Sequence, residues 1–165
     1  MNATPRLSLN FLSTAQAQKE FLINENAQIL DALVAGAVEE GPRNDPPGSP
    51  SLSDCYIIGT APTGQWAGAP NGVAIYGSGG WLVMSAVEGM SFLIKANGVC
   101  ATFRSGAWRI GEVEAASLRI EGKPVVGPRV AAIASPAGGS TVDTEARASI
   151  GQILAALRQH GLIET

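Results

Sequence analysis

Residues 71–83 read NGVAIYGSGGWLV, and residues 97–110 repeat the pattern as NGVCATFRSGAWRI. Each copy begins with Asn-Gly-Val, continues to an aromatic residue and ends with Ser-Gly-x-Trp, which predicts a β-hairpin closed by a glycine turn. The second strand of each hairpin opens with a tryptophan, Trp81 or Trp108. We therefore expect stacked hairpins that present equivalent aromatic rings to one core or one surface.

Short apolar runs surround this repeat, and glycine-rich turns separate them. One further hairpin is expected over residues 118–126, with Glu121-Gly122 at its turn. Together these features predict a small antiparallel β-domain over residues 52–127. Its main strands are expected at residues 55–58, 73–76, 81–84, 91–95, 99–103 and 108–110.

Residues 1–41 have the pattern of a helical region. Ser13 with Gln16 resembles a capping box, and Asn24 followed by Glu25 offers a second helix start. Gly41-Pro42 is expected to end the helix, and residues 42–51 contain several prolines, which predicts an extended linker. The apolar side chains recur at three- and four-residue spacing and form one stripe: Ile29, Leu30, Leu33, Val34 and Val38.

The C-terminal part of the chain predicts a linker over residues 128–142 and a helix within residues 143–165. Asp143 is a suitable N-cap, and Gly161 is a suitable left-handed C-cap. An isolated helix of this length is marginal, so its stripe must dock onto the domain or pair with another chain. That stripe consists of Ala146, Ile150, Ile153, Leu154 and Leu157. The sequence thus predicts an α+β fold with a helix at each end.

Composition narrows the class of partner. Only 15% of the 165 residues are charged, against roughly 25% in average domains, while 45% are hydrophobic. This shortage of charge favours a surface covered by identical subunits, although a weakly charged monomer is the alternative. The net charge of −3, with scattered basic residues, argues against a nucleic-acid partner. Neither a membrane-spanning run nor a secretion signal is indicated, so we expect synthesis and retention in the cytoplasm.

Catalytic chemistry has little support. The single histidine, His160, lies near a helix end and far from any predicted nucleophile, and the carboxylates are expected on the surface. We therefore expect no enzyme, no cofactor and no metal site. Cys55 and Cys100 are expected to be buried free thiols, with a disulfide as the alternative.

Aromatic residues are the candidates for ligand binding, because their faces stack on sugar rings. Trp81 and Trp108 can instead fill the cores of the two hairpins. Trp66 lies in the Gly-rich loop TGQWAG of residues 63–68, where surface and core are both plausible. The candidate carbohydrate-binding residues are Trp66, Tyr76, Trp81 and Trp108.

Several motifs resemble one family. They include LSLNFL (residues 7–12), AQAQK (15–19), DCYI (54–57), TGQWAG and the GGSTVDTEAR…HGLI sequence at the C-terminal end. The chain resembles a domain of unknown function found in fibre and head-spike proteins of bacteriophages and of gene transfer agents, the phage-derived particles that package host DNA.

This resemblance implies a structural virion component at the base of a head spike or fibre, assembled in the bacterial cytoplasm and released on lysis. The expected partners are capsid or tail proteins, a spike or fibre protein, and further copies of the chain in a trimer or pentamer. Candidate interface residues are Leu30, Leu33, Val34, Ile150, Ile153, Leu154 and Leu157. The alternative function is a carbohydrate-binding module that recognises host polysaccharide.

Overall fold

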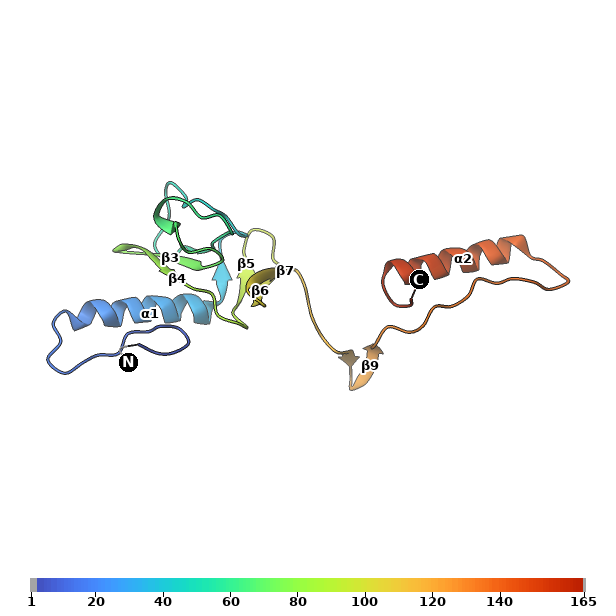
Figure 1. The fold of residues 1–165 in the computed structure, drawn as a ribbon, viewed down its shortest axis with the longest axis horizontal. Helices are drawn as coiled ribbons and strands as arrows, with labels where there is room; N and C mark the ends of the chain where they lie inside the picture. Colours follow the sequence, from blue (N-terminus) through green and yellow to red (C-terminus); the bar gives the residue numbers. More distant parts are fainter. Residues whose placement is uncertain (1–2, 165) are drawn as a thin grey trace. The chain divides into compact units, whose positions relative to one another are not determined.

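The computed structural model describes residues 3–164 and has an α+β fold, as the sequence predicts. The chain divides into two compact units, an N-terminal unit that ends at Val113 and a C-terminal unit that begins at Glu114 (Figure 1). Helix α1 (Lys19–Ala35) belongs to the same unit as the two larger sheets. The hairpin predicted over residues 118–126 belongs to the C-terminal unit, which differs from the predicted boundary of the β-domain.

Helix α1 begins at neither of the two predicted starts. It follows Gln18, which has a left-handed φ of 55° and makes no side-chain cap. The Ser13 backbone N–H donates to Gln16 Oε1 at 2.9 Å, so this pair closes a separate turn. Asn24, the second predicted start, lies inside the helix. Local capping signals therefore mark a turn before the helix and a position within it.

Helix α1 also ends earlier than Gly41-Pro42. Gly36 adopts a φ of 58°, and its N–H donates to Ala32 O at 3.1 Å, which completes a left-handed cap. Strand β1 (Ala37–Val38) follows at once and pairs in parallel with β5 (Ser91–Ile94). Val38 is consequently a buried strand residue, and the prediction that it extends the helical stripe is wrong.

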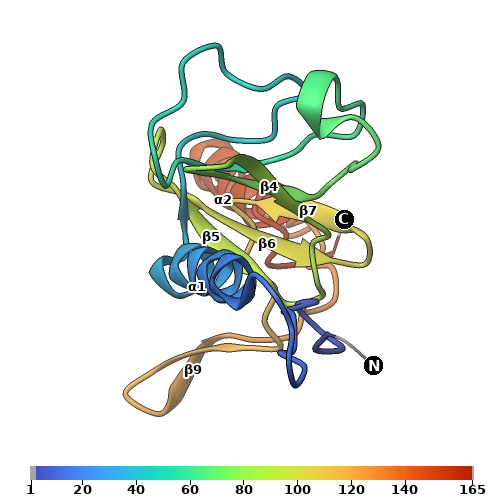
Figure 2. The ribbon, with the colours of Figure 1, turned by 90° about the vertical axis from the view of Figure 1, so that its left-hand side faces the viewer.

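The predicted strands of the repeat are confirmed. One sheet has the order β2 (Cys55–Ile57), β3 (Val73–Gly77) and β4 (Gly80–Met84), and the other has the order β1-β5-β6-β7. Strands β6 (Cys100–Arg104) and β7 (Ala107–Ile110) form the second hairpin. Figure 1 shows α1 running below β3 and β4, and Figure 2 shows the same helix nearly end-on. Ile29, Ala32 and Leu33 of α1 pack against the core that these sheets enclose.

The two hairpins are equivalent in register, but their tryptophans pack in different clusters. Tyr76 pairs with Trp81 across β3–β4, and Phe103 pairs with Trp108 across β6–β7. Trp81 packs against the cluster of Tyr56, Ile58, Trp66 and Ala74, whereas Trp108 packs against the larger cluster that contains Phe92 and Ile94. Because each hairpin belongs to a different sheet, the expected single surface of equivalent rings is not formed.

Hydrogen bonds attach the proline-rich segment over residues 42–51 to the rest of the N-terminal unit. Arg43 bridges to Ile58 in parallel, and the Gly59 N–H donates to Arg43 O at 2.8 Å. The Asn44 side chain accepts from the Ala61 N–H at 3.0 Å. This segment is therefore a loop of the unit instead of a free linker.

The C-terminal unit contains a hairpin and a helix. Strands β8 (Leu118–Ile120) and β9 (Lys123–Val126) pair around the predicted turn. Helix α2 (Thr144–Gln159) has the predicted N-cap, because Asp143 Oδ1 accepts from the Ala146 N–H at 2.8 Å. Of residues 114–164, the hydrophobic side chains that are buried are Leu154 and Ile163.

Candidate functional site

Four aromatic rings form a network in the N-terminal unit. The Trp81 ring lies at its centre, with centroid distances of 5.0 Å to both Trp66 and Tyr76 and 5.8 Å to Tyr56. Trp66 lies at the end of the short 3₁₀ helix η1 (Gly64–Trp66) and is completely buried. Because the whole side chain is buried, Trp66 has no exposed face on which a sugar can stack in this fold.

Trp108 is separated from that network. Its ring packs against Phe92 at 5.8 Å and Phe103 at 5.3 Å, and its Nε1–H donates to Asn71 O at 2.9 Å. Trp108 is half-buried. Among the four aromatic candidates, the fold therefore brings together only Tyr76 and Trp81 as partly exposed rings.

A groove runs between α1 and the β3–β4 hairpin. We call it the α1–β4 groove, and it consists of two neighbouring hollows of about 230 Å³ and about 150 Å³ that share Gln28 and Ser78 as lining residues. Trp81 lines the larger hollow and Tyr76 the smaller. The polar residues that line the groove from α1 are Asn24, Glu25, Gln28 and Asp31.

Sequence reasoning missed the contribution of α1 to this groove. Asn24, Gln28 and Asp31 are spaced by four and three residues, so they lie on one helix face. This four- and three-residue spacing is the signal in the sequence from which the polar helix face can be predicted. The neighbouring Gly77 leaves room for the Gln28 side chain as it is placed here, because a Cβ at this position would lie 2.3 Å from Gln28 Oε1.

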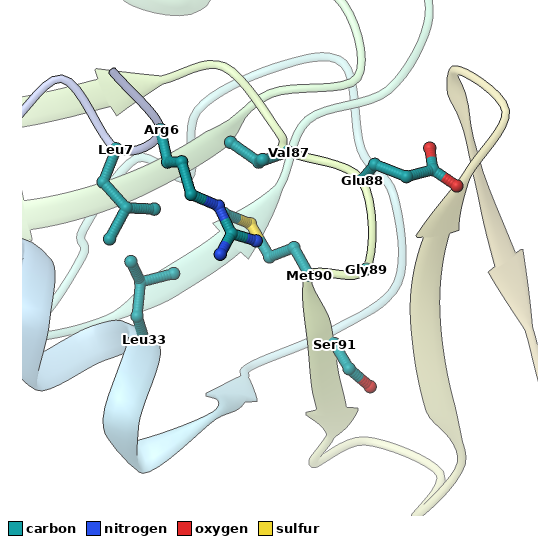
Figure 3. Close-up of a pocket in the computed structure, with 8 residues that line it drawn as sticks. All are labelled: Arg6, Leu7, Leu33, Val87, Glu88, Gly89, Met90 and Ser91. Atoms are coloured by element: carbon teal, nitrogen blue, oxygen red, sulfur yellow. The ribbon is translucent and has the colours of Figure 1, made fainter. Parts of the chain in front are cut away.

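Another cavity of the N-terminal unit lies apart from this groove. It has a volume of about 420 Å³ and lies between the N-terminal segment, the end of α1 and residues 87–91. Figure 3 shows Leu7 and Leu33 pointing toward one another, the Arg6 side chain extending beside Met90, and Glu88 pointing away. Leu33 is thus engaged within its own unit, and the cavity walls are mainly apolar.

The predicted interface residues separate into two groups. Leu33 and Leu157 are half-buried and Leu154 is buried, so these side chains pack at least partly within the chain. The others remain exposed, with exposed fractions of 43% for Leu30, 84% for Val34, 43% for Ile150 and 59% for Ile153. Both helices therefore keep an apolar face open.

The acidic residues near the sheets mainly pair with basic side chains. Glu39 Oε1 lies 2.5 Å from Lys95 Nζ, and this hydrogen bond raises the pKa of Lys95. Arg43 bonds Glu40 and lies 3.0 Å from Asp45 Oδ2. Across residues 3–164, no three His, Cys, Asp or Glu side chains gather closely enough to hold a metal ion.

The two cysteines occupy different environments. Cys55 is buried, and this burial is the main reason why the pKa of its thiol rises to about 12. Cys100 is a free thiol as expected but is exposed, so the prediction that both thiols are buried is wrong. Its neighbour Ala101 occupies the core-facing side of β6, and adjacent strand residues point to opposite faces.

Fold and groove together define a small α+β protein that combines an aromatic groove with exposed apolar helix faces. Neither helix described within residues 3–164 has the length and apolar character needed to cross a membrane.

Residues 23–109 match a family described as protein of unknown function (DUF2793), and the chain belongs to this family. No curated protein matches the sequence.

Proposed function

We propose that this protein is a non-enzymatic structural component of a phage-like particle such as a gene transfer agent, located at the base of a head spike or fibre. The observation that carries the proposal is the lack of a core in the C-terminal unit. Within its described residues, only Leu154 and Ile163 of the hydrophobic side chains are buried. The exposed hydrophobic residues are Val113 beside the boundary and, within the unit, Leu118, Ile120, Val125, Val126, Val130, Ile133, Val142, Ile150, Ile153 and Leu162.

The exposed apolar side chains of such a unit need to be buried by contact with other molecules. A segment of this size buries too little apolar area on its own to offset its conformational entropy. Exposed apolar residues at this density are typical of surfaces that contact other proteins. A symmetric assembly, in which each copy covers its neighbours and the whole contacts capsid or tail proteins, supplies this cover. The motif resemblance to fibre and head-spike proteins supports the same role.

The distribution of reactive groups favours a structural role over catalysis. His160 is the C-cap of α2, whereas the α1–β4 groove and the cavity beside Leu7 and Leu33 lie in the N-terminal unit. The groove offers carboxylate, amide and hydroxyl groups, but no histidine or cysteine lines it. These groups suit hydrogen bonding to a ligand.

The test is whether purified particles contain the protein and whether they need its C-terminal unit. We expect mass spectrometry to detect the full chain in particles and to show loss of a chain truncated after Val113. The circular dichroism of the truncated chain, with its β-sheet signal retained, is the control for folding. Absence of the full chain from particles, or equal incorporation of the truncated chain, would contradict the proposal.

A second candidate function is carbohydrate binding, in the same particle, through the α1–β4 groove. Partly exposed Trp81 and Tyr76 rings face a helix that carries Asn24, Gln28 and Asp31, and this combination of aromatic faces with amide and carboxylate groups suits a sugar. We expect Trp81→Ala to abolish binding to host polysaccharide, whereas the matched variant Trp108→Ala retains it. Equal binding by both variants, or none by the unaltered protein, would remove this function.

A further inference from the structure

We infer that the cavity beside Leu7 and Leu33 binds a medium-chain fatty acid, with the acyl chain against its apolar walls and the carboxylate at Arg6. This inference goes beyond the proposed structural function and does not depend on it, because it concerns a separate hollow of the N-terminal unit. The cavity has a volume of about 420 Å³, which lies within the range of small-molecule sites in proteins. We call it the Arg6 cavity.

A small hairpin near the N-terminal end forms one wall of the Arg6 cavity. Ala3 bridges to Asn10 in antiparallel fashion. The Asn26 side chain, on α1, holds Asn10 at two points, because its Oδ1 accepts from the Asn10 N–H at 2.9 Å and its Nδ2 donates to Asn10 O at 2.8 Å. The turn of this hairpin, which carries Arg6 and Leu7, is thereby kept beside α1.

The side chains of the walls suit an acyl chain. Figure 3 shows Leu7 and Leu33 pointing toward one another, with Val87 and Met90 across from them. These four side chains are apolar, and methionine adapts its shape readily to an irregular apolar ligand. A hydrocarbon chain placed among them leaves water without losing any hydrogen bond.

The backbone of the wall formed by residues 87–91 is already hydrogen-bonded within the unit. The Gly89 N–H donates to Phe103 O at 2.9 Å, and Met90 O accepts from the Phe103 N–H at 2.8 Å. The Met90 N–H donates to Val87 O at 2.9 Å. A bound peptide would find no partner in these groups for its own N–H and C=O groups, and burial of such groups without partners is costly. An acyl chain carries no such groups.

The charges at the Arg6 cavity favour an anionic headgroup. Within the part of the chain that the structure describes, no hydrogen bond or ion pair engages the Arg6 guanidinium. Glu88 points away in Figure 3, and its Oε2 accepts from the Ser105 N–H at 2.9 Å. Ser91 Oγ lies 3.3 Å from Thr102 Oγ1 and is hydrogen-bonded to it. The guanidinium is therefore the open polar group of the lining, and a guanidinium pairs with a carboxylate through two parallel hydrogen bonds.

Nuclear magnetic resonance of the full chain, with isotope-labelled methionine methyl groups, tests the inference. We expect decanoate to shift the Met90 signal saturably and to leave the signal of Met84, on β4 and outside the cavity lining, unchanged. The variant Met90→Leu assigns the signal. Affinity is expected to rise about fourfold for each methylene group between octanoate and decanoate, because each group buries further apolar area.

Arg6→Gln tests the contact with the carboxylate. Because Arg6 is exposed, its ion pair contributes modestly, and we expect the variant to bind decanoate about threefold to fivefold more weakly. Decanol, which has the same chain without the charge, is expected to bind the variant and the unaltered chain equally. The matched variant Lys19→Gln removes a positive charge at the other end of α1 and is expected to bind decanoate like the unaltered chain.

Several results would overturn the inference. These are a Met90 signal that decanoate does not move, equal movement of the Met84 and Met90 signals, and equal binding of decanoate by Arg6→Gln and the unaltered chain. Tighter binding of a short peptide with a C-terminal leucine than of decanoate would also overturn it. None of these results depends on the presence of the chain in particles, so failure of this inference and failure of the proposed function are distinguishable.

Discussion

Gly72 and Gly98 occupy the same place in the two Asn-Gly-Val motifs, yet the fold uses them for different reasons. A Cβ on Gly72 would lie 2.7 Å from Met84 O and 3.1 Å from Ala69 O, so this position needs glycine for close backbone approach. Gly98 has open space around it but a φ of 73°, so it needs glycine for conformation. The same Asn-Gly-Val motif therefore needs its glycine for close backbone approach in one copy and for a positive φ in the other.

We predict that Gly72→Ala lowers the free energy of unfolding by about 1–3 kcal/mol, because the new methyl group clashes with backbone that cannot move freely. Gly79→Ala is the control, since nothing lies within 4 Å of its Cβ position. Chemical denaturation of the two variants is the measurement. Equal stability of both variants would show that the backbone approach at Gly72 is not as tight as described.

The cysteines give a second prediction at the residue scale. Near pH 8 only a thiolate reacts with iodoacetamide, and a pKa of about 12 leaves almost no thiolate at Cys55. We expect modification of Cys100 alone in the folded chain and of both residues after unfolding. Peptide mass spectrometry locates the label, and rapid labelling of Cys55 in the folded chain would contradict its burial.

At the scale of the element, strands were more predictable from the sequence than helix ends. The hairpins were predicted because glycine turns and the Tyr76–Trp81 and Phe103–Trp108 spacings are local signals. The end of α1 was missed because Gly36 follows an Ala-rich stretch that has good helix propensity. Pairing of β1 with β5, which is distant in sequence, decides that boundary.

Helix α2 permits a test of its marginal stability. Gly151 lies in the helix interior with nothing within 4 Å of its Cβ position, so Gly151→Ala should stabilise the helix by about 0.5–1 kcal/mol. Gly161→Ala should instead destabilise it, because this residue has a φ of 71°. Circular dichroism of the full chain measures both, and a loss of helix in Gly151→Ala would contradict this account of α2.

At the scale of the whole molecule, the aromatic site was only partly predictable. Composition identified the rings, but burial of Trp66 depends on how the loop of residues 63–68 folds over Tyr56 and Trp81. The contribution of α1 to the α1–β4 groove likewise depends on tertiary packing between a helix and a hairpin. Nothing local in the sequence fixes such contacts.

The two-unit organisation predicts the course of limited proteolysis. Residues 114–142 are exposed throughout, so trypsin should cut first after Arg119 and Arg129 and leave a resistant N-terminal unit. Mass spectrometry of the early fragments identifies these sites. First cuts after Arg109, within β7, would contradict the boundary at Val113.

The central claim is that other copies of the chain bury the exposed apolar side chains of the C-terminal unit. Hydrogen exchange of the α2 amides, measured on the full chain at low and high protein concentration, tests it most directly. The account predicts fast exchange across Thr144–Gln159 in dilute solution and slow exchange once the chain assembles. Slow exchange that does not change with concentration would show that α2 is protected within a single chain, and would contradict the claim.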